Sequence, residues 1–168
     1  MNAQGPGSVL LLFLIMLTAC NPGLAAMPGG EPRPESEQAR QVLIGFLTEL
    51  HQGDYAQAAL YYGGSYQTML DHNPTLDPEH EPALLRNACQ VNGAQCLQVR
   101  TVELDHVAPA GEHVFWVEFQ TDDGALFSLG PCCAAPGTEQ PAQSTFVMTV
   151  VPTGDGAFRV VNMPPYAP

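Results

Sequence analysis

The pattern of apolar and polar positions divides the chain into a helical first part and a stranded second part. Between Ser36 and Gly53, apolar residues recur at steps of three and four, as on one face of an α-helix: Ala39, Val42, Leu43, Phe46, Leu47 and Leu50. From Cys96 onward, apolar and polar residues alternate with a period of two, which is typical of half-buried strands. The pattern predicts an α+β fold, with N-terminal helices packed on one face of a strongly bent antiparallel sheet.

Capping and breaking residues set the limits of the predicted helices. Ser36 and Asp54 are placed to cap the first two helices, and Gly53 and the Gly63-Gly64 pair end them. Pro82 suits the first turn of a later helix, which runs to the turn at Asn92. The helical elements predicted in this way cover 36–52, 55–62, 65–70 (a short turn) and 82–91.

Five strands are predicted in the second part, at 96–107, 113–120, 125–129, 144–151 and 157–163. In the first strand the apolar residues change face between Val99 and Val102, which predicts a bulge or bend near Arg100 and Thr101. In the second strand one face carries Phe115, Val117 and Phe119, and the other carries Val114 and Trp116.

The N-terminus has the features of an export signal. An apolar run over 9–17 is too short to span a bilayer but suits the hydrophobic region of a signal peptide. It ends at Leu17-Thr18-Ala19-Cys20, which resembles the lipobox of bacterial lipoproteins, in which cleavage before the cysteine leaves it to carry the acyl chains. The alternative is a secretory signal cut near Ala25, which would leave a soluble, secreted protein.

These features divide the chain into three parts. We expect a lipoprotein signal peptide at 1–19, a lipidated N-terminus with a Pro- and Gly-rich flexible tether at 20–35, and a single α+β domain at 36–168. The resemblance to lipoproteins implies that Cys20 anchors the domain to the extracytoplasmic face of a bacterial membrane.

The charge of the chain restricts its partners. It has seventeen acidic residues against five arginines, with no lysine, and a formal net charge of −12. Such a chain repels phosphate backbones and anionic lipid headgroups, which argues against nucleic-acid binding and against electrostatic membrane docking. The expected membrane contact is therefore the lipid anchor.

A local phrase in the helical part resembles a known superfamily. The segment at 46–63, FLTELHQGDYAQAALYYG, is similar to the opening of nuclear transport factor two-like domains, and Gly53, Asp54, Tyr55 and Ala58 carry the match. The resemblance implies a bent antiparallel sheet wrapped around helices, with a pocket at the wide end of the cone. Enzymes of that superfamily place Asp, His or Tyr in this pocket, but their catalytic pattern does not map onto this chain.

Four cysteines follow Cys20, namely Cys89, Cys96, Cys132 and Cys133. An even number in an oxidising compartment predicts disulfides, and these spacings do not fit a structural zinc site. A bridge from Cys89 to Cys96 would leave a strained bond between the adjacent Cys132 and Cys133. Crossing the two pairs avoids that strain, so we favour the crossed arrangement over the local one, with free thiols as a third alternative.

The candidates for a small-molecule pocket are aromatic residues with polar tips: Tyr55, Tyr62, Tyr66 and Trp116. The competing interpretation is that they pack with their polar ends in water.

The histidines are the other chemistry-bearing residues. His51 is expected at a helix C-terminus, and His72 and His80 lie in an acidic loop without the ligand spacing of a zinc or calcium site. His106 and His113 are expected to face each other at the exposed end of a hairpin. We therefore expect no metal and no cofactor, and we assign no catalytic residue.

Together these features predict an exported, membrane-anchored lipoprotein that acts as a non-catalytic binding or interaction module. The first alternative is an enzyme with a Tyr, His or Asp pair that acts on a small organic molecule. The second is thiol or metal handling by Cys132 and Cys133. The sequence does not assign the ligand or protein partner.

Overall fold

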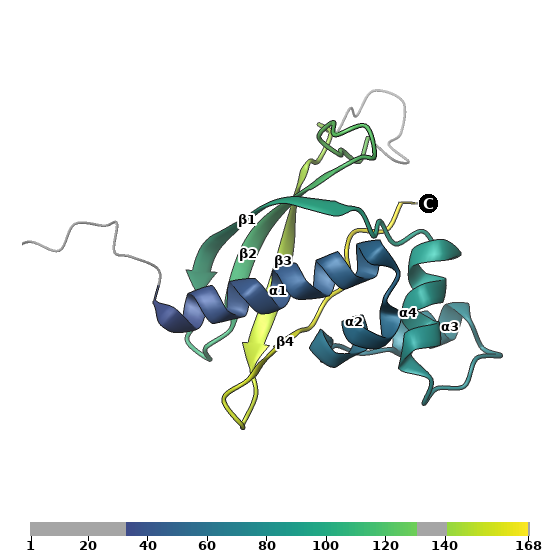
Figure 1. Cartoon of the computed structure of the whole chain (residues 1–168), viewed down its shortest axis with the longest axis horizontal. Helices are drawn as coiled ribbons and strands as arrows, with labels where there is room; N and C mark the ends of the chain where they lie inside the picture. The colour runs from purple at the N-terminus through teal and green to yellow at the C-terminus, as the bar shows by residue number, and fades with distance from the viewer. Residues whose placement is uncertain (1–32, 131–140, 168) are drawn as a thin grey trace, which may run out of the picture. The chain divides into compact units, whose positions relative to one another are not determined.

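The longest helix, α1, spans Pro34–Gln52 (Figure 1). The computed structural model describes residues 33–130 and 141–167. The helix begins two residues before the predicted cap, because Pro34 occupies its first turn, where the fixed φ of proline suits the helix. Ser36 is therefore a buried residue inside the helix and not its cap. Gly53 ends the helix with φ at 79°, a conformation that glycine adopts without steric penalty.

Three shorter helices follow: α2 at Tyr55–Tyr61, α3 at Gln67–His72 and α4 at Glu81–Gln90. The predicted cap of α2 is confirmed, because the Asp54 carboxylate accepts a hydrogen bond from the Gln57 amide at 3.1 Å. The predicted turn at 65–70 forms two residues later, as α3. In α4, Pro82 lies in the first turn as predicted, and the His80 ring accepts a hydrogen bond from the Ala83 amide at 3.2 Å.

Among the described residues, the second part of the domain is one antiparallel sheet of four strands in the order β1-β2-β3-β4. The strands are β1 at Gln98–Val107, β2 at His113–Gln120, β3 at Thr145–Pro152 and β4 at Phe158–Val160. The expected α+β class and the order of helices before strands are confirmed.

The predicted strand at 125–129 does not form. β1 pairs with one edge of β2, and β3 pairs with the other edge up to Glu118, so only the last residues of β2 are open to the following segment. That segment makes only isolated bridges, from Leu126 to Gln120 and from Leu129 to Gln143. The last predicted strand, 157–163, pairs only over Phe158–Val160. Beyond Val160, the side chain of Asn162 hydrogen-bonds to the backbone of β3. It accepts a hydrogen bond from the Thr149 amide and donates one to the Val147 carbonyl.

The bulge predicted near Arg100 is confirmed. The register of β1 against β2 shifts between Val99 and Thr101, and a second shift lies between Leu104 and His106. Each shift adds a residue to β1 that has no partner on β2, and such bulges bend the strand.

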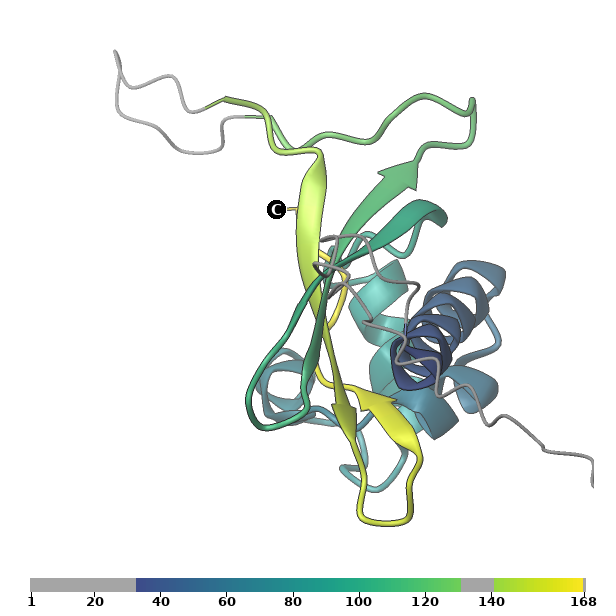
Figure 2. The same ribbon diagram turned by 90° about the vertical axis from the view of Figure 1, so that its left-hand side faces the viewer.

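Helix α1 packs on one face of the sheet (Figure 2) and α2 contacts β4, whereas α3 and α4 pack against other helices. Helix α1 contacts all four strands, and its stripe of Ala39, Leu43, Phe46, Leu47 and Leu50 is at most 1% exposed. The facing side chains of the sheet are at most 5% exposed, and they are Val102, Phe115, Val117, Phe119, Phe146, Met148 and Val150. Apolar side chains thus fill the space between α1 and the sheet. In the described part of the chain, no helix is both long and apolar enough to cross a membrane.

A disulfide joins Cys89 in α4 to Cys96, just before β1, across a Cα–Cα distance of 5.5 Å. It forms because the chain reverses directly after α4, where the Ala94 amide donates to the Ala88 carbonyl at 2.9 Å and brings the two cysteines together. The crossed arrangement favoured from the sequence is therefore wrong for this pair. Cys20, Cys132 and Cys133 lie outside the described residues.

We expect the Cys89→Ser/Cys96→Ser variant to lose about 2.5 kcal/mol of unfolding free energy, because the bridge restricts the unfolded chain over a short loop. Urea denaturation followed by circular dichroism measures the change. Reduction of the wild-type chain should lower its midpoint toward that of the variant. Equal midpoints for the oxidised wild type and the variant would contradict the prediction.

Candidate functional site

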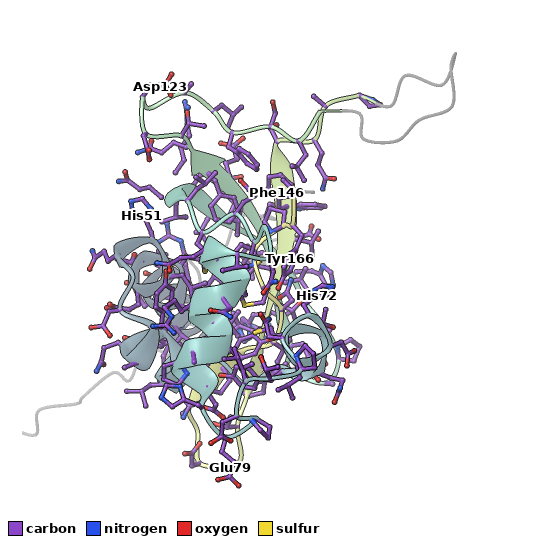
Figure 3. The ribbon with its side chains drawn as sticks, turned by 90° about the vertical axis from the view of Figure 1, so that its right-hand side faces the viewer. His51, His72, Glu79, Asp123, Phe146 and Tyr166 are labelled. Carbon is purple, nitrogen blue, oxygen red and sulfur yellow. A yellow bond between two sulfur atoms is a disulfide. The ribbon has the colours of Figure 1, made fainter. Side chains whose placement is uncertain are left out.

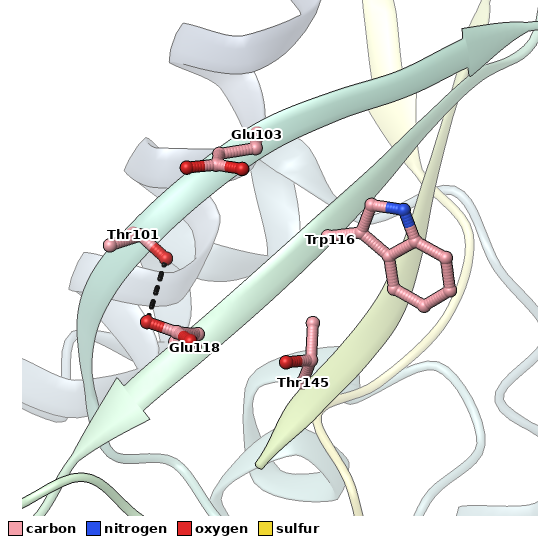
Figure 4. A pocket seen from close by; sticks show the side chains of 5 residues that line it. All are labelled: Thr101, Glu103, Trp116, Glu118 and Thr145. Carbon is pink, nitrogen blue, oxygen red and sulfur yellow. Dashed lines mark hydrogen bonds between the residues drawn. The ribbon is translucent and has the colours of Figure 1, made fainter.

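The outer face of the sheet, opposite α1, carries a shallow recess around Trp116 (Figure 4). We call it the tryptophan pocket; its volume is about 280 Å³ and its lining is Thr101, Glu103, Trp116, Glu118 and Thr145. The alternation of β2 explains its position, because Phe115 and Val117 point inward and force Trp116 and Glu118 outward. Trp116 remains 40% exposed.

The strand register surrounds the indole with specific neighbours. Glu103 on β1 lies directly opposite Trp116, and Val147 on β3 lies directly opposite it on the other side. Glu118 is two residues along β2 on the same face, where Thr101 donates a hydrogen bond to its carboxylate at 3.2 Å. Each cross-strand neighbour has its Cβ about 5 Å from that of its partner, so these side chains share one surface.

A second recess lies between the segment that follows α2 and the C-terminal segment of the chain. We call it the tyrosine groove; its volume is about 410 Å³, and its lining is Tyr62, Ser65, Thr68, Met69, Val161, Met163, Pro164, Pro165 and Tyr166. The groove is held in place by an isolated bridge between Tyr62 and Val160 and by close backbone approach at Gly64. A Cβ at Gly64 would lie 2.3 Å from the Val161 carbonyl oxygen, so only glycine fits there.

Three tyrosines are partly or fully shielded from water: Tyr62 and Tyr166, which line the tyrosine groove, and the adjacent Tyr66. Burial, with a smaller contribution from Tyr166, raises the pKa of Tyr62 to about 12. Burial is also the main cause that raises the pKa of Tyr66, with additional repulsion from Glu81 and Tyr62, and it raises the pKa of Tyr166. These phenols therefore stay neutral at physiological pH.

Tyr66 has a free hydrogen-bonding group within the described residues. Its ring packs edge-on against Tyr62 at 5.0 Å, while Tyr62 stacks on Phe46 at 5.6 Å and donates to the Ser65 carbonyl at 3.2 Å. The Tyr66 hydroxyl is buried with no partner among the described atoms. A buried hydroxyl without a partner is unfavourable, but Tyr66 is not among the residues that line the tyrosine groove.

The four aromatic residues predicted to share a pocket do not lie together. Tyr62 lines the tyrosine groove and Tyr66 contacts Tyr62, whereas Trp116 lies in the separate tryptophan pocket on the sheet. Tyr55, at the start of α2, is partly buried and packs against the main core.

No protein-family model matches this chain, and no curated protein sequence matches it. Its function is therefore inferred from the geometry and chemistry of the two recesses.

The histidines do not build an active site. His106 lies opposite Val114 and His113 opposite Val107, so the two rings do not face each other as predicted. His106 is exposed and bonds to the adjacent Asp105, whereas His113 is only 4% exposed and packs against Phe115 and Phe158. The Nδ1 atom of His113 is buried without a partner in the described structure. The ring therefore lacks the carboxylate that would orient a general base.

The other histidines have structural positions. The Nδ1 atom of His51, in the last turn of α1, lies 3.3 Å from the Cys96 carbonyl oxygen, in keeping with its expected role at a helix end. His80 caps α4. In Figure 3 the side chains of His51, His72 and Glu79 lie on different parts of the domain. Among residues 33–130 and 141–167, no three His, Cys, Asp or Glu side chains gather closely enough to hold a metal ion.

Of the residues that line the two recesses, only Tyr62 and Trp116 were predicted from the sequence. Tyr166 enters the tyrosine groove because an isolated bridge pairs it with Ala94, which no local pattern indicates. Glu103 and Glu118 flank Trp116 only after β1 and β2 pair with a bulge in β1. Glu103 and Glu118 could have been found from the sequence by aligning the two predicted strands as a hairpin that includes the predicted bulge.

Alkaline titration of the folded chain, followed by tyrosinate absorbance near 295 nm, should show a late component that includes Tyr62 at about pH 12. The Tyr62→Phe variant should remove part of this component. Because the folded pKa exceeds the ordinary 10.0, the free energy of unfolding should fall as pH rises from that value toward 12. In urea the late component should vanish, and its persistence would contradict the assignment to burial.

Proposed function

We propose that this protein is an exported lipoprotein, anchored to the extracytoplasmic face of a bacterial membrane through Cys20, whose domain is a non-catalytic binding module. The Leu17-Thr18-Ala19-Cys20 sequence supports the anchor. The Cys89–Cys96 disulfide supports export, because such bonds persist in oxidising compartments.

The domain is proposed to be nuclear transport factor two-like. Two features support this: helices precede an antiparallel meander, and the Gly53-Asp54-Tyr55 phrase joins α1 to α2. Gly53 supplies the left-handed residue that ends α1, and Asp54 caps α2, so the phrase has a structural reason independent of any activity.

The observation that carries a binding function is the uncovered outer face of the sheet. Trp116 is 40% exposed and Val147 is 45% exposed on this face, and within the described residues no helix packs on it. Tryptophan is enriched at protein interfaces because it offers a large apolar surface with a polar tip. The inner face is filled by phenylalanine and aliphatic side chains, which leaves binding to the outside of the fold.

The tyrosine groove favours a second candidate, the binding of a small organic molecule. Its volume of about 410 Å³ is within the range of ligand pockets, and its lining mixes apolar and hydroxyl side chains. An enzyme would in addition need a base within reach of the ligand.

The lipid anchor is tested by metabolic labelling with an alkyne analogue of palmitate in a bacterial host. The wild-type chain should incorporate the label and have a mature N-terminus at Cys20, whereas the Cys20→Ala variant should not incorporate it. The Cys89→Ser/Cys96→Ser variant should be labelled like the wild type. An unlabelled wild-type chain that begins near residue 26 would instead show a secreted protein.

The binding face is tested by photo-cross-linking in intact cells, with p-benzoylphenylalanine placed at Val147 or at Val91. Val91 lies at the end of α4, is 70% exposed and lines neither recess, so it is the matched control. We expect a discrete adduct from the Val147 position and none from the Val91 position. Equal yields from both positions would contradict a binding face on the sheet.

A further inference from the structure

Two acidic side chains beside Trp116 have no cationic partner among the described residues. The salt bridges in this part of the chain are Arg40–Glu37 and His106–Asp105, and neither involves Glu103 or Glu118. Glu118 receives one hydrogen bond from Thr101, and Glu103 is exposed. The tryptophan pocket therefore presents an aromatic ring and two carboxylates on one open surface.

We propose that the tryptophan pocket binds an arginine side chain of a basic protein partner. The inference rests on the proposed binding function and adds the chemistry of the partner. A guanidinium is flat, so it stacks on an indole ring and at the same time donates to carboxylates at its edge. Figure 4 shows Trp116 on one side of the pocket and Glu103 and Glu118 on the other, which is the arrangement that such a group fits.

The remaining neighbours suit the other parts of an arginine side chain. Val147 lies directly across from Trp116 and offers an apolar surface for the methylene stem. Thr145 lies opposite Glu118 and adds a hydroxyl at the rim of the pocket. Lysine fits less well, because its ammonium group is a compact, strongly hydrated charge without a plane to stack.

The charge of the whole chain favours a basic protein as the source of this group. With a formal net charge of −12, the chain attracts positively charged partners over distances beyond direct contact. The pocket is shallow and its volume is about 280 Å³, so it receives one side chain while the surrounding sheet face contacts the rest of the partner. A free small cation would lack those surrounding contacts.

The proposal is tested with a fluorescein-labelled peptide containing two arginines, added to the full-length chain in a neutral detergent and followed by anisotropy. A second peptide has citrulline in place of arginine, which keeps the planar shape and removes the charge. A third has lysine. We expect the arginine peptide to bind at least about tenfold more tightly than the citrulline peptide, and the lysine peptide to have an intermediate affinity. The affinity for the arginine peptide should fall as salt is added.

Two variants locate the binding. Trp116→Leu and Glu103→Gln/Glu118→Gln should each weaken arginine-peptide binding by at least about fivefold. The control, Glu35→Gln/Glu79→Gln, makes the same change in charge at exposed sites away from this face and should stay within about twofold. Thermal denaturation checks that all of the variants fold. Trp116 is the only tryptophan of the chain, so its emission should change when the peptide binds.

Several results would overturn the proposal. They are equal binding of the arginine and citrulline peptides, no measurable binding, or equal losses in the site and control variants. Self-association of the wild-type chain that is lost in Trp116→Leu, without peptide binding, would assign the face to a second copy of the chain. A cross-linked adduct at Val147 without binding of the arginine peptide would support the proposed binding function and contradict only the proposal of a basic partner.

Discussion

The contact between α1 and the inner face of the sheet determines most of what the domain presents to solvent. Leu43, Phe46 and Leu50 on α1 pack toward the same core as Phe115 and Val117 on β2, and all of these side chains are at most 1% exposed. Successive residues of a strand point to opposite faces. Once Phe115 and Val117 are buried against the helix, their neighbours on β2 have to point away from it. The outer face around Trp116 is thus a direct consequence of the core.

The same core fills the space between α1 and the sheet in the described residues. Aromatic and aliphatic side chains occupy the space between α1 and the sheet, and His113 is enclosed by Phe115 and Phe158 without a carboxylate partner. The two recesses therefore lie outside this packed interior, one on the outer sheet face and one beside the last residues of the chain. Their chemistry differs: the first is acidic and aromatic, and the second combines neutral phenols with apolar side chains.

Local patterns predicted the elements well where the physical signal was local. The helical stripe of α1, the Asp54 cap and the alternation of β2 each depend on residues close in the chain, and the structure contains all three. The missing strand at 125–129 is an error of another kind, because distant segments compete for the same backbone groups. The segment 125–129 has the alternation of a strand, but β1 and β3 leave only the end of β2, beyond Glu118, open to it.

The sequence by itself determined the class of fold and the division of β2 into a face with Phe115 and Val117 and a face with Trp116, because helix and strand periodicity follow from local geometry. Which of these two faces is buried was decided by the packing of α1. Only the tertiary structure decided the neighbours of each exposed side chain. The bulge in β1 sets the register that places Glu103 and Glu118 beside Trp116, and the end of the chain brings Tyr166 to Tyr62. Likewise, two cysteines form a disulfide only where the distance between their Cα atoms permits it. The chain reversal after α4 sets that distance for Cys89 and Cys96.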